Sequence, residues 1–250
     1  MQYNKPALTF DEQHDLLAGR GLCMPDRLRT MRWLKHISYY RLSAYFLPFK
    51  TGEQFAAGAS FDQVAGLYIF DRKLRLVLLD AMAERISRET FVGHFRARYR
   101  DEPHLPLWMA SELMSFGRLS RMFKACHPDI KKVFARRLDV ADVTIVSSWL
   151  HTLNYVRNVC AHHSRLWNRE LAVKPILPRR SPAWPYPLVG ADRLYCVLVI
   201  IRHALLRAWP QCRWRERLFE LIDRHPEVDL SAMQFPENWR NLPPWTDTGR

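Results

Sequence analysis

Hydrophobic residues recur at intervals of three and four along most of the chain, and this periodicity predicts an all-α protein. A capping-box sequence at Thr9–Glu12 opens the first helix, and Gly19 and Gly21 supply its stop. The stretch 192–209 is apolar on nearly every side, which places it at the centre of the core. No segment carries a convincing β-strand pattern. Further helices are predicted at 26–46, 61–95, 111–123, 129–138, 143–169 and 213–223.

Loops rich in glycine and proline organise these helices. The main interruptions are the stretch 51–60 and a run of five prolines within residues 175–187. We therefore expect an N-terminal helical region packed on the core (1–50), a helical core (51–210) and a C-terminal helix with a tail that wraps the surface (211–250).

The proline-rich segment also carries Arg179, Arg180, Trp184 and Tyr186. The interpretation we favour is an ordered loop that packs on the core through its aromatic side chains. The alternative is a basic, aromatic flap that stacks bases and contacts the phosphates of single-stranded RNA.

Two pairs of opposite charges fall four residues apart in the long stretch 61–95. Asp71 precedes Arg75, and Glu84 precedes Arg88, at the spacing that brings side chains together on a helix surface. We interpret both as exposed pairs that stabilise the helix by about 0.2–0.5 kcal/mol each.

The stretch 143–169 has a polar face of unusual composition. At about 100° per residue, one arc is apolar and the opposite arc contains no Lys, Glu or Asp. The apolar arc holds Ile145, Val146, Trp149, Leu153, Val156 and Cys160, and the polar arc holds His151, Asn154, Asn158, His162 and Arg165. Asn and His are mediocre helix formers, so a face built from them needs a reason other than helix stability.

The composition favours a polyanionic partner for this face. The 250 residues are 48% hydrophobic, which is enough for a real core, and Lys plus Arg outnumber Asp plus Glu by 38 to 25. A formal charge of +13 makes nucleic acid the first candidate. The longest apolar run, 194–201, is too short to span a membrane, and the first residues lack the apolar segment of a secretory signal. We therefore expect a cytoplasmic protein with no membrane partner.

The cysteines favour neither a disulfide framework nor a zinc ribbon. There are five, an odd number, and no two have the CxxC spacing. Cys160, His162 and His163 lie close together, yet no further ligands follow at a workable spacing. We expect buried thiols, no metal and no cofactor.

Arg157, Asn158 and His162 place three useful side-chain types within six residues. Cleaving RNA without a metal requires an acid or base near the 2′-hydroxyl and the leaving oxygen, together with donors for the charged transition state. Histidine titrates in the right range for the first task, and the planar arginine fork suits the second. Asparagine can orient the phosphate or the histidine. The polar face therefore fits phosphate chemistry on RNA.

The same residues carry a family resemblance. Arg157-Asn158-x-x-x-His162 resembles the RNxxxH form of the R-x(4–6)-H signature of HEPN-domain ribonucleases, and residues 149–156 and 164–169 resemble the AbiD/AbiF-like abortive-infection proteins. The loose spacing also occurs at Arg29/His36, Arg88/His94, Arg98/His104 and Arg121/His127. Of these arginines and Arg157, only Arg157 is followed by Asn. Further similar segments follow in order at 8–13, 38–45, 70–75 and 235–239, so the resemblance covers essentially the whole chain.

This resemblance implies a HEPN-like helical bundle and a metal-independent endoribonuclease of an abortive-infection (anti-phage) or toxin–antitoxin system. His162 would act as general acid or base, Arg157 would stabilise the phosphate transition state, and Asn158 would hold the phosphate or the histidine. The implied RNA contacts are Asn154, Arg165 and Arg169. Capping of the helix C-terminus is an equally good interpretation of the last two. HEPN proteins commonly pair two motifs across a homodimer, which implies a composite active site, and an antitoxin or a noncoding RNA would be a further partner.

Ideal helical geometry separates Arg157 from His162 by about 140°, so one helix does not aim both side chains at one target. Asn158 and His162, four residues apart, do face together. Either the helix distorts, or the long Arg157 side chain reaches around, or another copy of the motif completes the site. His163 would turn toward the apolar side of a continuous helix, and we interpret it as a core or interface histidine.

Two other classes of function compete with the nuclease. One is a catalytically silent RNA-binding protein that acts with a noncoding RNA in phage defence and uses the same basic face. The other is a helical module that binds a membrane surface or a protein, for which charge and amphipathic helices suffice. The latter leaves the Asn/His face without an explanation.

Overall fold

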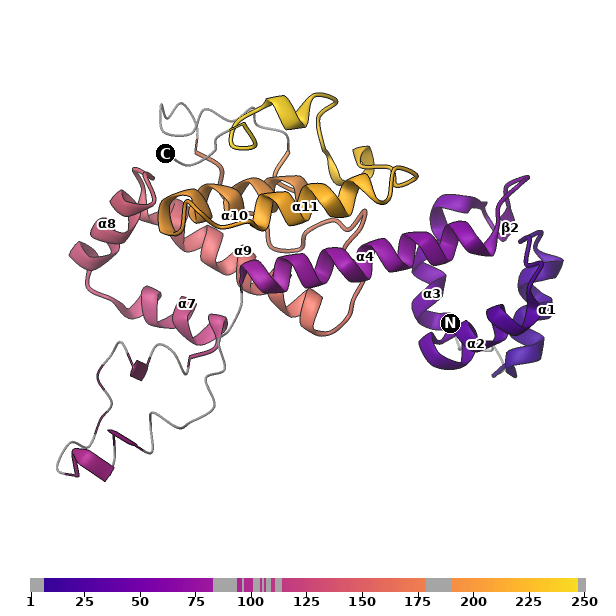
Figure 1. Cartoon of the computed structure of the whole chain (residues 1–250), viewed down its shortest axis with the longest axis horizontal. Coiled ribbons are helices and arrows are strands. Elements are labelled where there is room, and N and C mark those ends of the chain that lie inside the picture. Colours follow the sequence, from indigo (N-terminus) through magenta and orange to yellow (C-terminus); the bar gives the residue numbers. More distant parts are fainter. Residues whose placement is uncertain are drawn as a thin grey trace, which may run out of the picture. The chain divides into compact units, whose positions relative to one another are not determined.

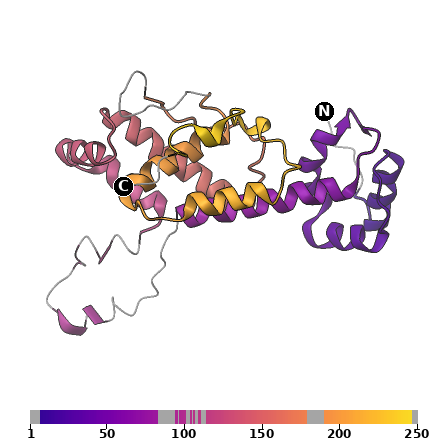
Figure 2. The ribbon, with the colours of Figure 1, turned by 45° about the horizontal axis from the view of Figure 1, so that its top comes forward.

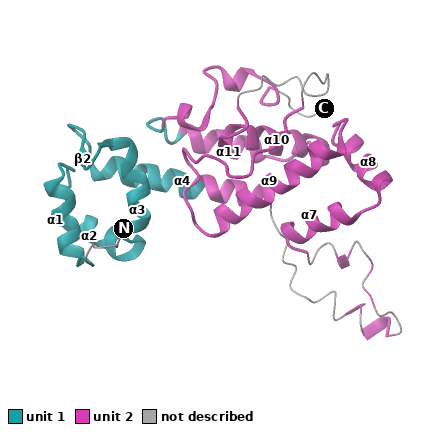
Figure 3. Cartoon of the chain, turned by 180° about the vertical axis from the view of Figure 1, so that it is seen from behind, with its two compact units in different colours: residues 1–73, 224–228 teal, residues 74–223, 229–250 magenta. Residues whose placement is uncertain are grey.

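The computed structural model describes residues 7–82, 94–95, 97–100, 104, 106, 109–110, 114–178 and 190–246. Within these ranges the regular secondary structure is helical apart from one small hairpin and an isolated bridge between Cys23 and Ser60, which confirms the predicted all-α class (Figure 1). The chain divides into two compact units, residues 1–73 with 224–228 and residues 74–223 with 229–250 (Figure 3). The boundaries predicted after residues 50 and 210 were placed at loops. The first boundary between the two units instead lies between residues 73 and 74, within a continuous helix.

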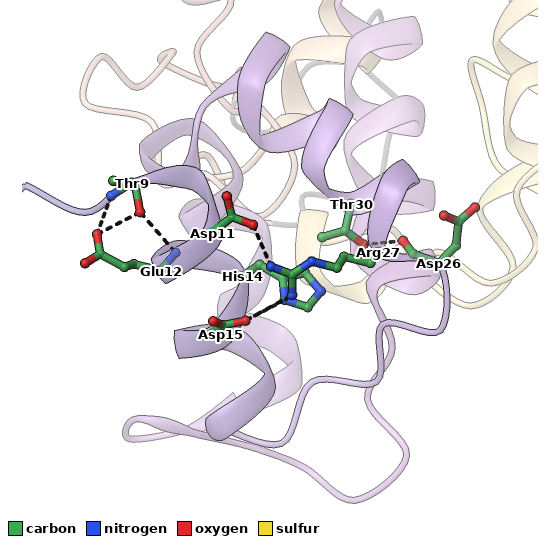
Figure 4. Close-up of polar contacts among 8 residues, drawn as sticks. All are labelled: Thr9, Asp11, Glu12, His14, Asp15, Asp26, Arg27 and Thr30. Atoms are coloured by element: carbon green, nitrogen blue, oxygen red, sulfur yellow. Dashed lines mark hydrogen bonds and ion pairs between the residues drawn. The ribbon is translucent and has the colours of Figure 1, made fainter.

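The first helix, α1 (Phe10–Gly19), begins with the predicted capping box. The Thr9 hydroxyl accepts from the backbone N–H of Glu12, and the Glu12 carboxylate accepts from the backbone N–H of Thr9 at 2.7 Å (Figure 4). These bonds satisfy backbone N–H groups that have no partner within the helix. The hydrogen bonds from Thr9 also lower the pKa of the Glu12 carboxyl below its ordinary value. Four consecutive residues are therefore enough to set this helix start.

Arg27, the first residue of α2 (Arg27–Ile37), ties this helix to α1. Its guanidinium donates to Asp11 at 2.5 Å and to Asp15 at 3.1 Å, two carboxylates on successive turns of α1 (Figure 4). Because these groups are exposed, water screens their attraction. The bonds therefore orient the two helices more than they stabilise them.

The predicted helical run 26–46 is split in two at Ser38. This residue adopts a φ of 76°, which ends α2, and its hydroxyl accepts from the backbone N–H of Arg41 at the start of α3 (Tyr39–Phe46). A positive φ is uncommon for any residue other than glycine. The prediction of one continuous helical run was therefore wrong at Ser38. The break is not indicated by a Gly or Pro at this position.

A short antiparallel hairpin stands where the sequence predicted only a loop. β1 (Lys50–Thr51) pairs with β2 (Gln54–Phe55), and Gly52 adopts a φ of 62° in the turn between them. Glycine suits this turn because a positive φ costs it little. Strands of two residues are too short to show an alternating pattern, which is why the sequence did not indicate them.

The long helix α4 (Phe61–Ala81) buries two charged residues that were predicted to be an exposed pair. Asp71 is 0% exposed and Arg75 is 2% exposed, so the prediction of an exposed pair was wrong. Its buried side chains include Val64, Leu67, Phe70, Asp71, Leu74, Arg75 and Leu78. The second predicted pair, Glu84 with Arg88, lies outside the described residues. Asp71 and Arg75 continue the spacing of the apolar residues, so the pattern already assigned them to the buried face.

The second unit is built around α10 (Leu194–Ala208). Every residue from Leu194 to His203 is buried, as the apolar pattern predicted. Trp214 of α11 (Trp214–Asp223) is also buried, and its indole N–H donates to the carbonyl of Val77 in α4 at 2.9 Å. Figures 1 and 2 show α11 beside this end of α4. In the described part of the chain, no helix has both the length and the apolar character to cross a membrane.

The C-terminal tail is anchored in the core as well as passing over the surface. Trp239 in a short 3₁₀ turn and Trp245 are 6% and 2% exposed. The indole N–H of Trp245 donates to the hydroxyl of Tyr195 on α10 at 3.1 Å. The prediction of a tail that only wraps the surface was therefore incomplete, because its tryptophans form part of the core.

The proline-rich segment is described up to residue 178 and again from residue 190. Pro175 and Pro178 are buried, and the intervening Ile176 accepts at its carbonyl from the indole N–H of Trp149 at 2.9 Å. This part of the segment packs on the core. Arg179, Arg180, Trp184 and Tyr186 lie outside the described residues, so the two interpretations of this segment both stay predictions.

All five cysteines are free thiols. Cys160, Cys196 and Cys212 are buried as expected, Cys126 is half-buried, and the expectation of burial was wrong for the exposed Cys23. Burial raises the pKa of the Cys196 thiol to about 12. That thiol therefore stays protonated and unreactive at neutral pH.

His203 in α10 is expected to make the fold sensitive to acid. It is fully buried, and its Nε2 lies 2.7 Å from the carbonyl oxygen of Leu138. Burial lowers its pKa from 6.5 to about 4, because the charged form would lose its hydration. Between these values the unfolded chain binds a proton that the folded chain does not, so stability falls as the pH falls. We expect a loss of about 2 kcal/mol between pH 7 and pH 5 from this group.

Denaturant unfolding at the two pH values measures this loss, with His203→Gln as the comparison. Glutamine does not titrate, so the variant should lose this part of the pH dependence. An identical pH dependence in both proteins would contradict the assignment to His203.

Candidate functional site on α9

The helix α9 (Val143–Ala161) has the two faces that the sequence predicted. Asp142 caps its start by accepting from the backbone N–H of Thr144 at 2.7 Å. The buried residues are Val146, Trp149, Thr152, Leu153, Val156, Val159 and Cys160. On the other side His151 is exposed, and Asn154 and Asn158 are half-buried. The apolar arc thus faces the core and leaves the Asn/His arc accessible.

A hydrogen-bonded turn ends α9 at His162, well before the predicted end. His163 adopts a φ of 55°, and its backbone N–H donates to the carbonyl of Cys160 at 3.0 Å. The N–H of Ser164 donates to the carbonyl of Val159 at 3.0 Å. This pair of bonds is the Schellman motif, in which glycine usually holds the left-handed position. His163 is exposed in this turn, so it is not a core histidine, and its place at an interface stays a prediction.

The early end of the helix changes the setting of Arg165 and Arg169, which both lie beyond it. Arg169 turns back onto the helix, where its Nε donates to the hydroxyl of Tyr155 at 3.1 Å and its Nη1 to the carbonyl of Arg165 at 3.1 Å. Arg165 is therefore not part of the polar arc, which corrects the helical prediction. The roles of both arginines and of Asn154 as RNA contacts stay predictions.

Arg157 and Asn158 touch each other, whereas His162 is exposed. Nη1 of Arg157 donates to Oδ1 of Asn158 at 3.2 Å, and both side chains are half-buried. The backbone N–H of His162 donates to the carbonyl of Asn158 at 2.9 Å, one helical turn back. Within the described ranges the His162 imidazole makes no hydrogen bond. The structure therefore joins two of the three motif residues and leaves the third accessible to a substrate.

Asn154, one turn before Asn158, lies against the start of α7 (Phe116–Ala125). A Cβ atom on Gly117 would lie 3.0 Å from Oδ1 of Asn154, so the glycine lets the two helices approach closely. This role of Gly117 was not predicted from the sequence. A lone glycine inside an amphipathic helix was the signal that could have found it.

Arg75 of α4 supports the turn that follows His162. Its Nη1 donates to the carbonyl oxygen of Ser164 at 3.3 Å, and the side chain is almost completely buried. This role was not predicted from the sequence, because Arg75 was interpreted as half of an exposed ion pair. A charged residue on the apolar stripe of a helix was the overlooked signal.

Replacing Arg75 with Met is expected to lower the free energy of unfolding by about 2 kcal/mol, because the partly buried Ser164 carbonyl loses a donor. Denaturant unfolding measures the change. Arg72→Met is the matched control, since Arg72 is an exposed arginine of the same helix. Equal stability of the two variants would show that the bond to Ser164 supports nothing.

Comparison with known protein families shows the family to which the chain belongs. Residues 32–86 and 81–168 match the sequence model of the Abi-like protein family, a span of more than half of the chain that includes the whole motif of α9. The chain belongs to the Abi-like protein family. Membership indicates a role of this Abi-like protein in abortive infection. No curated protein and no solved structure matches the chain.

The segment that carries the motif in this Abi-like protein is rich in groups that can bind an anion. Among the described residues, no three His, Cys, Asp or Glu side chains gather where they could hold a metal ion. Between Arg157 and Arg169 the sequence contains three arginines, two histidines and no acidic residue. Such a segment can bind a phosphate through guanidinium donors and can move a proton through an imidazole.

Proposed function

We propose that this Abi-like protein is a metal-independent endoribonuclease of the HEPN type, acting in abortive infection against phage or as the toxin of a toxin–antitoxin system. The observation that carries the proposal is the end of α9, where Asn158 holds Arg157 and His162 is exposed one turn beyond. A half-buried guanidinium together with an accessible imidazole nearby in the chain is the minimal set of groups for acid–base cleavage of RNA.

In the proposed reaction the 2′-oxygen of the RNA forms a bond to the adjacent phosphorus while the bond to the 5′-oxygen breaks. His162 accepts the proton of the 2′-hydroxyl or donates one to the leaving 5′-oxygen, and water takes or supplies the other proton. Arg157 donates to the phosphate oxygens as their charge develops. Asn158 keeps the guanidinium oriented by accepting one of its N–H groups. The products are a 2′,3′-cyclic phosphate and a free 5′-hydroxyl.

A homodimer is part of the proposal. Arg157 and His162 differ by about 140° around an ideal helix, and no hydrogen bond joins their side chains within the described part of the chain. A second α9 facing the first would bring His162 of one copy toward Arg157 of the other. The exposed position of His162 leaves room for such a partner.

The test is the chemistry of the products. RNA incubated with the purified protein and EDTA should yield fragments with a free 5′-hydroxyl and a 2′,3′-cyclic phosphate or 3′-phosphate end. The matched substrate with 2′-deoxynucleotides should not be cut, since it lacks the attacking oxygen. Products with 5′-phosphates that form only with added magnesium would refute this mechanism.

The second candidate is an RNA-binding protein without catalysis that acts with a noncoding RNA. The separation of Arg157 and His162 favours it, because catalytic groups held apart in one copy would bind RNA without cutting it. Tight binding of RNA by a protein that yields no fragments under any of the conditions above would support this candidate over the nuclease.

A further inference from the structure

We infer that α7 presents a phosphate-binding face along which the RNA lies as it approaches the end of α9. This face, called here the α7 basic face, consists of Arg118, Arg121 and Lys124. The inference rests on the proposed function, because the RNA is the substrate proposed above, and it adds a binding surface that the motif of α9 does not contain.

The three cations of the α7 basic face share one side of the helix. They stand three residues apart, so at about 100° per residue they fall within an arc of about 120°. All three are exposed, whereas Ser120 and Phe123 on the opposite side are buried. None of the three forms an ion pair within the described residues. Three neighbouring cations repel one another where the described residues supply no counter-charge, and this repulsion favours an anion beside them.

The adjoining helix α8 (Pro128–Arg137) strengthens this positive charge. From Phe116 to Arg137 the sequence contains seven Lys and Arg residues and a single acidic residue, Asp129. Lys132 is paired with Asp129 at 3.3 Å, and Nζ of Lys131 donates to the carbonyl of Lys124 at 2.6 Å. The start of α8 thus lies beside the end of α7, and the positive potential extends over both helices.

The α7 basic face is contiguous with the polar arc of α9. Arg118 follows Gly117, and Gly117 lies against Asn154 of that arc. Asn154 and His162 are eight residues apart, which is about 12 Å along a helix at 1.5 Å per residue. A nucleic-acid strand bound at His162 can therefore continue past Asn154 onto α7 within a few nucleotides.

The chemistry of the face favours RNA over a membrane. A helix that binds a bilayer inserts its apolar side, but on the apolar side of α7 Phe123 is buried, and Phe116, Leu119 and Met122 are half-buried against the protein. What remains exposed is a row of cations with a rise of about 4.5 Å between neighbours. Such a row can follow the phosphates of a strand and needs no apolar ligand.

The test compares two triple variants of the full chain that lose the same charge. One carries Arg118→Gln, Arg121→Gln and Lys124→Gln. The control carries Arg32→Gln, Lys35→Gln and Arg213→Gln, which are exposed cations on other segments of the chain with no ion pair within the described residues. The probe is a single-stranded RNA with 2′-O-methyl groups, which binds but cannot be cut through its 2′-oxygen. Circular dichroism verifies that both variants are folded.

We expect the α7 variant to bind this probe at least about tenfold more weakly than the control. The slope of log Kd against log salt concentration should fall by about 2, at about 0.7 per lost contact with a single strand. Equal affinity and slope in the two variants would overturn the inference, as would a wild-type chain that binds no RNA. The inference would also be refuted if the α7 variant lost binding to phosphatidylglycerol vesicles while it kept binding to RNA.

These results separate the inference from the nuclease itself, because the probe is never cleaved. A wild-type chain that cuts ordinary RNA, combined with an α7 variant that binds like the control, refutes only the α7 basic face. A chain that binds through α7 and cuts nothing refutes only the endoribonuclease.

Discussion

Replacing His162 with Ala is expected to slow RNA cleavage by about 10²- to 10⁴-fold, the usual contribution of a general acid or base. The imidazole is exposed and makes no hydrogen bond within the described ranges, so its loss should not disturb the fold. Binding of the 2′-O-methyl RNA should be nearly unchanged, because one exposed histidine contributes little to phosphate contacts. Single-turnover cleavage and binding of the probe measure the two effects separately.

His163→Gly is the matched control for this prediction. Glycine adopts the positive φ of residue 163 without strain, so the turn that ends α9 should be kept and the variant should be more stable by about 1 kcal/mol. Cleavage should continue at the wild-type rate. If His163→Gly abolished cleavage while His162→Ala did not, the acid–base role would belong to His163.

Asn158→Asp is expected to reduce cleavage by about 10²- to 10³-fold, the typical cost of losing one donor for a developing negative charge. Aspartate has the shape of asparagine and can still accept from Nη1 of Arg157, which lies 3.2 Å from Oδ1. Its negative charge, however, offsets the guanidinium and repels the phosphate. Stability should be unchanged or slightly higher, so unfolding and cleavage measured on the same preparation separate the two effects.

The control for this change is His151→Asp, which adds a carboxylate to the same face of α9 at an exposed position. It should affect cleavage far less than Asn158→Asp, because it lies about two turns from the motif. Equal losses in the two variants would mean that total charge, and not the hold on Arg157, determines activity.

Features that depend on near neighbours in the chain were predictable from sequence. The capping box at Thr9 involves residues three apart, and the burial of Leu194 to His203 follows from a helix that is apolar all round. The two faces of α9 belong to the same class, because helical periodicity alone assigns each residue to an arc. The structure agrees with all three predictions.

The misjudged features depend on residues far apart in the sequence. The end of α9 rests on a turn in which His163, and not glycine, takes the left-handed position, and Arg75, 89 residues away from Ser164, donates to that turn. The helical periodicity of a sequence carries no information about contacts between separate helices. Arg75 is a related case: its helical spacing matches the buried face, but its partner Ser164 lies on a distant segment, so its charge alone led to the prediction that it is exposed.

The order of residues is enough to show that the chain is helical, that it is strongly basic, and that one amphipathic helix carries Arg157, Asn158 and His162 on or beside its polar side. The folded chain is needed to show where that helix ends, which residue supports its end, and which helix lies against its polar arc at Gly117. The physical reason is the range of the interactions. Helix periodicity and caps act over about four residues, whereas burial and the pairing of buried polar groups depend on segments that meet only in the folded chain.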